Sequence, residues 1–257
     1  MMGDKPLRPG EKGRIVKWKT YMKRLSAAVA IFLSGVVVGC NTTRMMPKGP
    51  IPQGLPTARP EGAGWIDLLD SANATAWRNT TDDLDIFELN DGVLHIFGRT
   101  VHPLRYVTYT AQEFDDFDLH LEFKLSPRAN SGIFLRAQAN DPVYRGFEVQ
   151  VLDDYGRLPT KNSCGAIYDV VTPMFNMSRP AGEWNSFDIT VVGKSVSIVM
   201  NGWTIIQTDL SKMTTPLGKF KVAYNDLPLS GFLALQDHGG EVWYRNMLIR
   251  PRQSSVQ

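Results

Sequence analysis

Long apolar runs are scarce in this sequence. The longest, Leu25 to Gly39, has 15 residues, whereas a helix needs about 20 to span a bilayer. Helical periodicity is scarce as well, because no stretch of a dozen residues is convincingly amphipathic. These two absences argue against a membrane-spanning protein and against a fold built on helices.

Residues typical of metal and nucleotide sites are also few. The cysteines are Cys40 and Cys164, and they do not combine with the four histidines at zinc spacing. No glycine-rich loop has the form of a nucleotide-binding site. No Asp-rich calcium loop is visible, although oxygen ligands such as Asp153 leave a divalent cation open. We therefore expect no cofactor, and the sequence identifies no metal site.

The first 40 residues contain an export signal. The segment "MKRLSAAVAIFLSGVVVGC" (22–40) has a basic start, an apolar run of signal-peptide length and small residues before Cys40. This resembles a bacterial lipoprotein signal, which implies cleavage before Cys40 and lipidation of its thiol. Since Met22 opens a complete signal, we expect translation to begin there. Residues 1–39 are then a leader, and the mature protein is lipid-anchored to the membrane, facing the periplasm or the cell surface.

Removing this leader reverses the sign of the net charge. Of 28 basic and 26 acidic residues, the leader holds 8 and 2, so 20 basic and 24 acidic residues remain. An acidic mature protein lacks electrostatic support for a nucleic-acid partner. Lipidation of Cys40 would also leave Cys164 alone, which excludes an internal disulfide.

The mature chain divides into a tether and a folded unit. Residues 40–64 have five prolines between Pro47 and Pro60 and no hydrophobic periodicity, which predicts an extended tether. The folded unit is expected at 65–251, a length that suits one domain, and 252–257 form a tail.

Strand signals dominate the folded unit. Its apolar segments alternate or are rich in β-branched and aromatic residues: "FDLHLEFKL" (117–125), "SGIFLRAQ" (131–138), "FEVQVLD" (147–153), "FDITVVGKSVSIVMNGWTI" (187–205), "GFLALQDH" (231–238) and "VWYRNMLIRP" (242–251). Turn signals at Gly193-Lys194 and Asn201-Gly202 predict three successive antiparallel strands. The pattern predicts an all-β fold, an antiparallel two-sheet β-sandwich, without choosing between jelly-roll and immunoglobulin-like topology.

Several blocks of the folded unit resemble, in the same order, the DUF1080 family, also called the 3-keto-disaccharide hydrolase domain. They are "GWIDLLDSANATAWRN" (64–79), "FDLHLEFKLSPRANSGIFLRAQ" (117–138), "GFEVQVLDD" (146–154), "CGAIYDV" (164–170), "GEWNSFDITVVGKSVSIVMNG" (182–202) and "LALQDHGGEVWYRNMLIRP" (233–251). The resemblance implies a concanavalin A-like jelly roll that cleaves the glycosidic bond of 3-keto-glycosides. It also implies a separate sugar 3-oxidoreductase as functional partner, since this chain has no nucleotide-binding loop.

The strand at 147–153 supplies the candidate catalytic carboxylate. Alternation places Glu148 and Gln150 on one face, which in a jelly roll is the natural sugar groove. The motif Glu148-x-Gln150-x-x-Asp153 has the spacing used by retaining endoglucanases of this fold, which need two carboxylates about 5–5.5 Å apart. Here the middle residue is an amide, and Asp153 would need a β-bulge to reach the Glu148 face. A retaining glycosidase using Glu148 and Asp153 is therefore an alternative.

The chemistry implied by the resemblance needs fewer carboxylates. A ketone at sugar carbon 3 acidifies the hydrogen on carbon 2, so a base can remove it, the glycosidic oxygen can leave, and water can add. Glu148 and His238 are the candidate base and acid, with the two roles open. Histidine titrates in the useful range unaided, whereas a strand glutamate needs burial to raise its pKa.

Other polar residues are candidate contacts for the carbohydrate substrate: Asn130, Arg136, Gln150, Asp153, Tyr168 and Gln236. Alternation from Gly132 predicts that Arg136 shares its face, and arginine supplies fixed donors. Tyr168 could stack on a ring or donate to a hydroxyl. Gln236 alternates with His238 and should face the same way.

A non-catalytic glycan-binding module is the second class of function, because this fold hosts many such modules. A lectin groove keeps aromatic platforms and hydrogen-bond donors. It has no need for Glu148 and His238 together, so this pair favours an enzyme.

Overall fold

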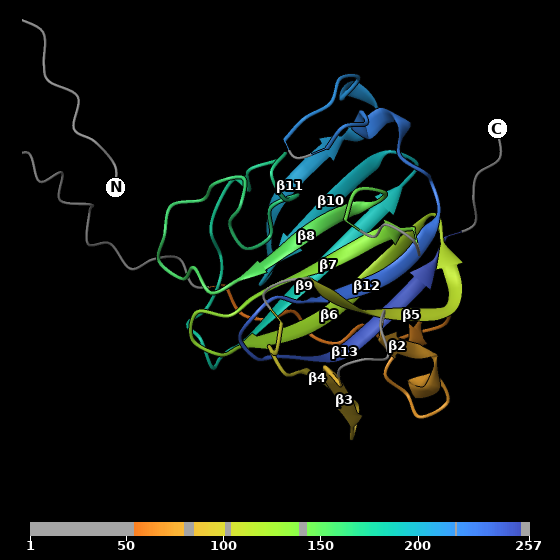
Figure 1. Ribbon diagram of the computed structural model, residues 1–257, viewed down its shortest axis with the longest axis vertical. Coiled ribbons are helices and arrows are strands. Elements are labelled where there is room, and N and C mark those ends of the chain that lie inside the picture. Colours follow the sequence, from red (N-terminus) through yellow and green to blue (C-terminus); the bar gives the residue numbers. More distant parts are fainter. Residues whose placement is uncertain (1–53, 80–84, 101–103, 139–142, 219, 253–257) are drawn as a thin grey trace, which may run out of the picture. The chain divides into compact units, whose positions relative to one another are not determined.

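The computed structural model describes residues 54–79, 85–100, 104–138, 143–218 and 220–252. These residues form an all-β unit of two antiparallel sheets (Figure 1), which confirms the predicted fold class. The expected leader, Met22, Cys40 and the C-terminal residues 253–257 lie outside the described residues. Within the described part, no helix is long and apolar enough to cross a membrane.

The larger sheet has eight strands. Seven of them lie in the order β11, β10, β9, β6, β13, β4 and β3, and β1 pairs with β13. Their bounds are β1 Ile66–Asp67, β3 Phe87–Asn90, β4 Val93–Ile96, β6 Phe117–Leu125, β9 Trp184–Val192, β10 Ser195–Met200, β11 Trp203–Asp209 and β13 Val242–Pro251.

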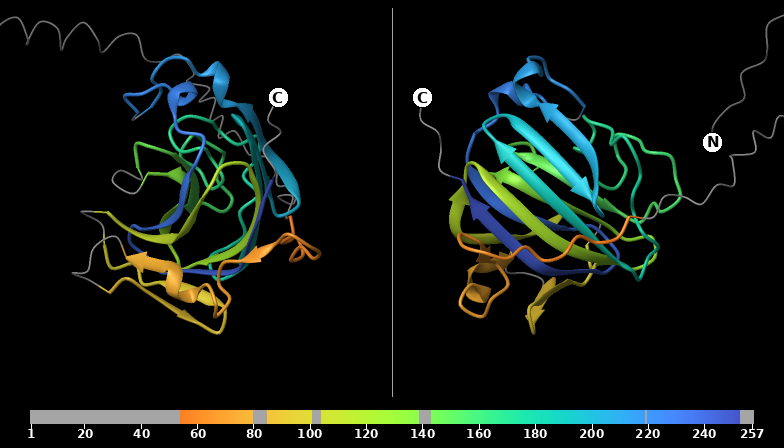
Figure 2. Two further views of the ribbon diagram at one scale, coloured as in Figure 1. Left: turned by 90° about the vertical axis from the view of Figure 1, so that its right-hand side faces the viewer. Right: turned by 180° about the vertical axis from the view of Figure 1, so that it is seen from behind.

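The smaller sheet has five strands and packs face to face with the larger one (Figure 2). Its spatial order is β2, β5, β12, β7 and β8. The bounds are β2 Trp77–Asn79, β5 Arg105–Phe114, β7 Asn130–Ala137, β8 Phe147–Leu152 and β12 Gly231–Asp237. Three single 3-10 turns complete the described elements: η1 Ala74–Ala76, η2 Leu210–Lys212 and η3 Tyr224–Asp226.

The strands expected from alternation are all present. The segment 187–205 forms β9, β10 and β11 as successive antiparallel neighbours, as predicted. At the second turn, Asn201 and Gly202 have φ angles of 50° and 82°, the left-handed pair that a two-residue hairpin turn requires. Strand β5 was not among the expected strands, because its second half is polar and exposed.

The core lies between the sheets and follows the same alternation. Phe123 of β6 and Phe187 of β9 are fully buried, and their rings stack with centroids 4.9 Å apart. Ile133 and Val149 of the smaller sheet are also fully buried in this core. Each such side chain contributes about 1.5–3 kcal/mol on burial. Their strand neighbours necessarily point to the outer faces of the sandwich.

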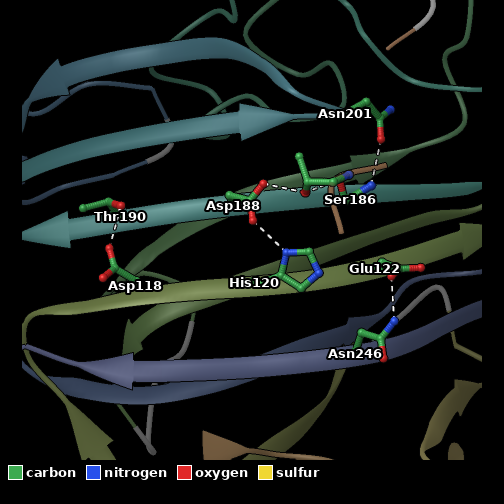
Figure 3. Close-up of polar contacts among 9 residues, drawn as sticks. Asp118, His120, Glu122, Ser186, Asp188, Thr190, Asn201 and Asn246 are labelled. Carbon is green, nitrogen blue, oxygen red and sulfur yellow. Dashed lines mark hydrogen bonds and ion pairs between the residues drawn. The ribbon is translucent and has the colours of Figure 1, made fainter. Parts of the chain in front are cut away.

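The outer face of the larger sheet carries a paired polar network (Figure 3). Asp118 accepts from Thr190 at 2.8 Å, and His120 Nδ1 lies 2.7 Å from Asp188. Burial acts to raise the pKa of Asp118, but hydrogen bonds from Arg252, Arg250 and Thr190 outweigh it, so the pKa lies below its usual value. These carboxylates are tolerated at this depth because they are paired, whereas His120 Nε2 is buried without a hydrogen-bond partner among the described residues.

The segment before the first strand crosses this polar face (Figure 2). Thr57 donates its N–H to Ser186 Oγ at 2.8 Å and its hydroxyl to Asp188 at 2.6 Å. Arg179 donates to the carbonyl oxygen of Gly54 at 3.1 Å. The folded unit therefore begins by Gly54 rather than at Trp65, because these hydrogen bonds attach the end of the expected tether to the sheet.

Candidate functional site

A cavity of about 200 Å³ lies on the outer face of the smaller sheet. Its lining residues are Leu104, Asn130, Val143, Tyr144, Glu148, Gln150, Tyr168, Gln236 and His238. Six of the expected site residues are therefore brought together here. A larger hollow of about 390 Å³ lies beside Trp65, but no histidine lines it, and its Asp67 is ion-paired with Arg59 at 2.9 Å. Of these two hollows in the described part of the chain, the smaller one combines a histidine with a carboxylate.

Glu148 reaches the cavity because the side chains of β8 alternate between faces and because Gly132, its diagonal neighbour on β7, has no side chain. In the register of the two strands, Glu148 lies opposite Phe134 and Gln150 opposite Gly132. A Cβ atom on Gly132 would lie 2.3 Å from Glu148 Oε1. Gly132 thus makes the room that the carboxylate occupies, and Glu148 is only 3% exposed.

The segment after β8 folds back along its edge and carries Tyr168 to the site. Gln150 N–H donates to Ala166 O at 3.0 Å, and Tyr168 N–H donates to Glu148 O at 2.9 Å. Burial, and then the charges of Glu148 and Asp169, raise the pKa of Tyr168. Its phenol therefore keeps its proton at neutral pH and can donate to a substrate oxygen.

Strand β12 brings Gln236 and, just beyond its end, His238. Gln236 is 4% exposed, and its Oε1 has no hydrogen-bond partner among the described residues. That oxygen can accept from a sugar hydroxyl. The Asn130 amide lies 2.7 Å from His238 Nδ1 and 2.9 Å from the Gln150 amide. A polar chain therefore runs from β8 across β7 to His238.

Arg136 lies outside the cavity, and the expectation for it was wrong. Its φ of 51° is in the left-handed region, which breaks the alternation from Gly132. The guanidinium donates to Asp115 O at 2.6 and 2.8 Å and to Gly193 O at 2.6 Å. Arg136 therefore connects two turns and does not line the cavity.

Asp153 also lies outside the cavity. Strand β8 ends at Leu152, and Asp153 Oδ2 accepts from the N–H of Arg128 at 2.7 Å. The next carboxylate, Asp154, accepts from Cys164 N–H at 3.1 Å and from Ser178 Oγ at 3.3 Å. Glu148 is thus the cavity's carboxylate among the described residues, which removes the arrangement that a retaining glycosidase using Asp153 requires.

Part of the cavity wall comes from loop residues that strand periodicity did not reveal. Tyr144 lines the cavity and packs edge-on against Phe220, which packs edge-on against Tyr224. Burial, and then the charges of Glu148 and Asp169, raise the pKa of Tyr224. This row of rings therefore extends from the cavity wall to Tyr224, which is close enough to Glu148 to be affected by its charge.

Metal-ligand clusters are absent from the described part of the chain. No group of three or more His, Cys, Asp or Glu side chains there could hold an ion.

Comparison with known proteins gives concordant results. A family model described as a 3-keto-alpha-glucoside-1,2-lyase-like domain matches residues 64–250. A protein of Bacteroides thetaiotaomicron named 3-keto-disaccharide hydrolase is 30% identical over 226 residues, covering 73% of this chain and 78% of its own.

Solved structures from Parabacteroides distasonis that are assigned as glycosyl hydrolases share the architecture. One is 25% identical with a TM-score of 0.63, covering 73% of this chain and 99% of its own. Another is 26% identical with a TM-score of 0.57, covering 84% of this chain and 99% of its own.

Proposed function

This chain belongs to the 3-keto-disaccharide hydrolase family and is an enzyme of the glycoside hydrolase type, and from that premise we propose that it cleaves 3-keto-glycosides by elimination and hydration. The observation that carries the proposal is the pairing of Glu148 with His238 in one cavity, on the two sides of strand β7. An acid–base pair without a second carboxylate suits proton abstraction better than double displacement.

The proposed reaction has two stages. First, a base takes the proton from C2, the electron pair passes to the C3 carbonyl as an enolate, and the glycosidic oxygen leaves C1 with a proton. Second, water adds its hydroxyl to C1 of the resulting C1–C2 double bond and returns a proton to C2. Atoms and charge balance with water as the one co-reactant, and the products are a free 3-keto sugar and the released alcohol or sugar.

The other cavity residues supply binding and charge stabilisation in this scheme. The Tyr168 phenol, which retains its proton, donates to the enolate oxygen in this scheme, a contribution of about 10²–10³-fold in comparable sites. Gln236 Oε1, buried without a described partner, accepts from a sugar hydroxyl. The ketone itself must come from a separate sugar oxidoreductase, which we propose as the functional partner.

The mechanism predicts hydrogen exchange at C2. Purified mature protein, incubated in deuterium oxide with a 3-keto-disaccharide, should release free sugar and introduce deuterium at C2 of product or recovered substrate, as measured by mass spectrometry and NMR. The unoxidised parent disaccharide should be inert. Rapid cleavage of that parent without exchange would contradict elimination, and binding of the 3-keto sugar without turnover would indicate a glycan-binding module instead.

We also propose that Cys40 carries a lipid that anchors the domain to the membrane. Because the carbonyl oxygen of Gly54 already accepts from Arg179 of the folded unit, the tether between Cys40 and Gly54 comprises residues 41–53. At about 3 Å per residue, an extended segment of this length reaches roughly 40 Å, enough to hold the domain clear of the lipid surface. Multiple acylation is needed for a stable anchor, since one chain binds marginally.

Replacing Cys40 by serine should leave an unlipidated precursor. Labelled palmitate should enter the wild-type protein and not the variant, and the variant should keep its leader in the N-terminal sequence. A matched Cys164→Ser variant removes the buried thiol and should still be labelled. Labelling of the Cys40→Ser protein as a mature membrane lipoprotein would contradict the assignment.

A further inference from the structure

Two side-chain amides connect Glu148 to His238, and their orientation determines where the proton of His238 lies. The Gln150 and Asn130 amides are 2.9 Å apart, and the Asn130 amide is 2.7 Å from His238 Nδ1. The oxygen and nitrogen of an amide are nearly identical in shape, so their placement must follow from the groups around them.

The backbone carbonyl of Ser131 determines the orientation of Gln150. The end of the Gln150 amide that points away from Asn130 lies 3.2 Å from both Ser131 O and Glu148 Oε1. A backbone carbonyl can only accept a hydrogen bond, so this end must be the NH₂ group. The Gln150 oxygen then faces Asn130, so the Asn130 amide must turn as well: its NH₂ group, rather than its oxygen, meets Gln150, and its oxygen, rather than its NH₂ group, meets His238.

We infer that Gln150 and Asn130 are positioning residues that hold the proton of neutral His238 on Nδ1, so that Nε2 is the nitrogen that accepts the C2 proton. The Asn130 amide lies 2.7 Å from Nδ1, and once its oxygen is turned to the ring by the orientation of Gln150, this contact requires a hydrogen on that ring nitrogen. His238 is then the base, and Glu148 donates the proton with which the glycosidic oxygen leaves. This assignment of roles rests on the proposed function, whereas the position of the proton does not.

The two amides are held by rigid strands. Gln150 is 3% exposed, and Ser131, with 0% exposed, donates its hydroxyl to Gln236 O at 2.7 Å. Asn130 N–H donates to Gly239 O at 3.1 Å, which fixes the turn that carries His238. A hydrogen-bonded partner on the second ring nitrogen sets the tautomer and the ring orientation together, as it does in triads of catalytic residues.

Nitrogen NMR measures the tautomer without substrate. The mature protein, labelled with ¹⁵N-histidine and held above the pH of imidazole titration, should show the His238 proton on Nδ1 and the unprotonated Nε2 signal far downfield. A His238→Gln variant identifies the signals that belong to this residue. A proton on Nε2 would overturn the inference, whatever the enzyme is found to hydrolyse.

Substitution of Asn130 then tests the coupling to catalysis. Asn130→Asp keeps an acceptor and adds a charge beside the ring, so the acid limb of the kcat/KM profile should move up by about one pH unit. Asn130→Leu removes the acceptor, and kcat should fall about 10²-fold with KM within about twofold, while the NMR spectrum shows a mixture of tautomers.

The exposed Asn90 of β3 provides the matched control, because Asn90→Asp adds the same charge and should leave the pH profile unchanged. If Asn130→Leu raised KM with kcat and the tautomer unchanged, Asn130 would be a sugar contact and the inference would fall. If neither the wild-type protein nor its variants cleaved 3-keto-glycosides, the proposed function would fail, and the NMR result would still decide the position of the proton.

Discussion

Replacing Glu148 by glutamine is expected to lower kcat by about 10²–10⁴-fold, the usual contribution of a general acid or base. Glutamine keeps the size of the side chain and can still accept from Gln150, whose amide lies 3.2 Å from Oε1. It cannot transfer a proton. Binding of the 3-keto-glycoside and the melting temperature should therefore change little, as calorimetry would show.

Glu113→Gln on strand β5 provides a matched control, because this exposed residue lies outside the cavity. Its carboxylate accepts a hydrogen bond from the Ser230 hydroxyl at 3.0 Å. The variant should retain wild-type kcat. A Glu148→Gln enzyme with wild-type kcat would place the acid–base chemistry on another residue.

Replacing Gly132 by alanine should be almost as damaging to turnover, although Gly132 carries no chemistry. The new Cβ would lie 2.3 Å from Glu148 Oε1 and 3.0 Å from its Cγ and Cδ, so the carboxylate must move. Misplacement of a catalytic group by about 1 Å can cost about 10²-fold. The displaced atoms are the flexible end of a side chain, so the fold should persist and the circular dichroism spectrum should match wild type.

A double variant separates displacement from any other effect of the methyl group. In the Glu148→Gln background, Gly132→Ala should add little further loss, because the group that it displaces no longer transfers a proton. If the losses of kcat in the two single variants instead multiplied in the double variant, Gly132 would act independently of Glu148.

Period-2 alternation was sufficient to predict most of the sandwich. The strand at 147–152 illustrates why: each residue's face follows from its own position, so the core residue Val149 and the cavity residue Glu148 were distinguishable without any partner strand. The same rule failed at Arg136, where a left-handed φ of 51° turns the side chain away. No local sequence signal identifies such a φ at an arginine, and the hydrogen bonds that reward it come from distant turns.

The cavity could be predicted in part. Glu148 and Gln150 lie within one strand and were expected on its polar face, and Gln236 was expected to face the same way as His238. Tyr144 lies in a loop whose path depends on packing against Phe220, 76 residues further along the chain. Because loop geometry is set by such tertiary contacts, periodicity gave no signal for it.

By itself, the sequence determined the all-β class, most strand positions and the polar face that carries Glu148, because these depend on turn residues and on alternation between neighbours. Apart from the hairpin-linked strands β9, β10 and β11, only the tertiary structure decided which strands lie side by side. The placement of β7 between β12 and β8 brings Asn130 between His238 and Gln150. His238 and Gln150 are more than 80 positions apart in the sequence. Beyond such hairpins, strand order and register depend on the packing of the whole sandwich, and no local pattern encodes them.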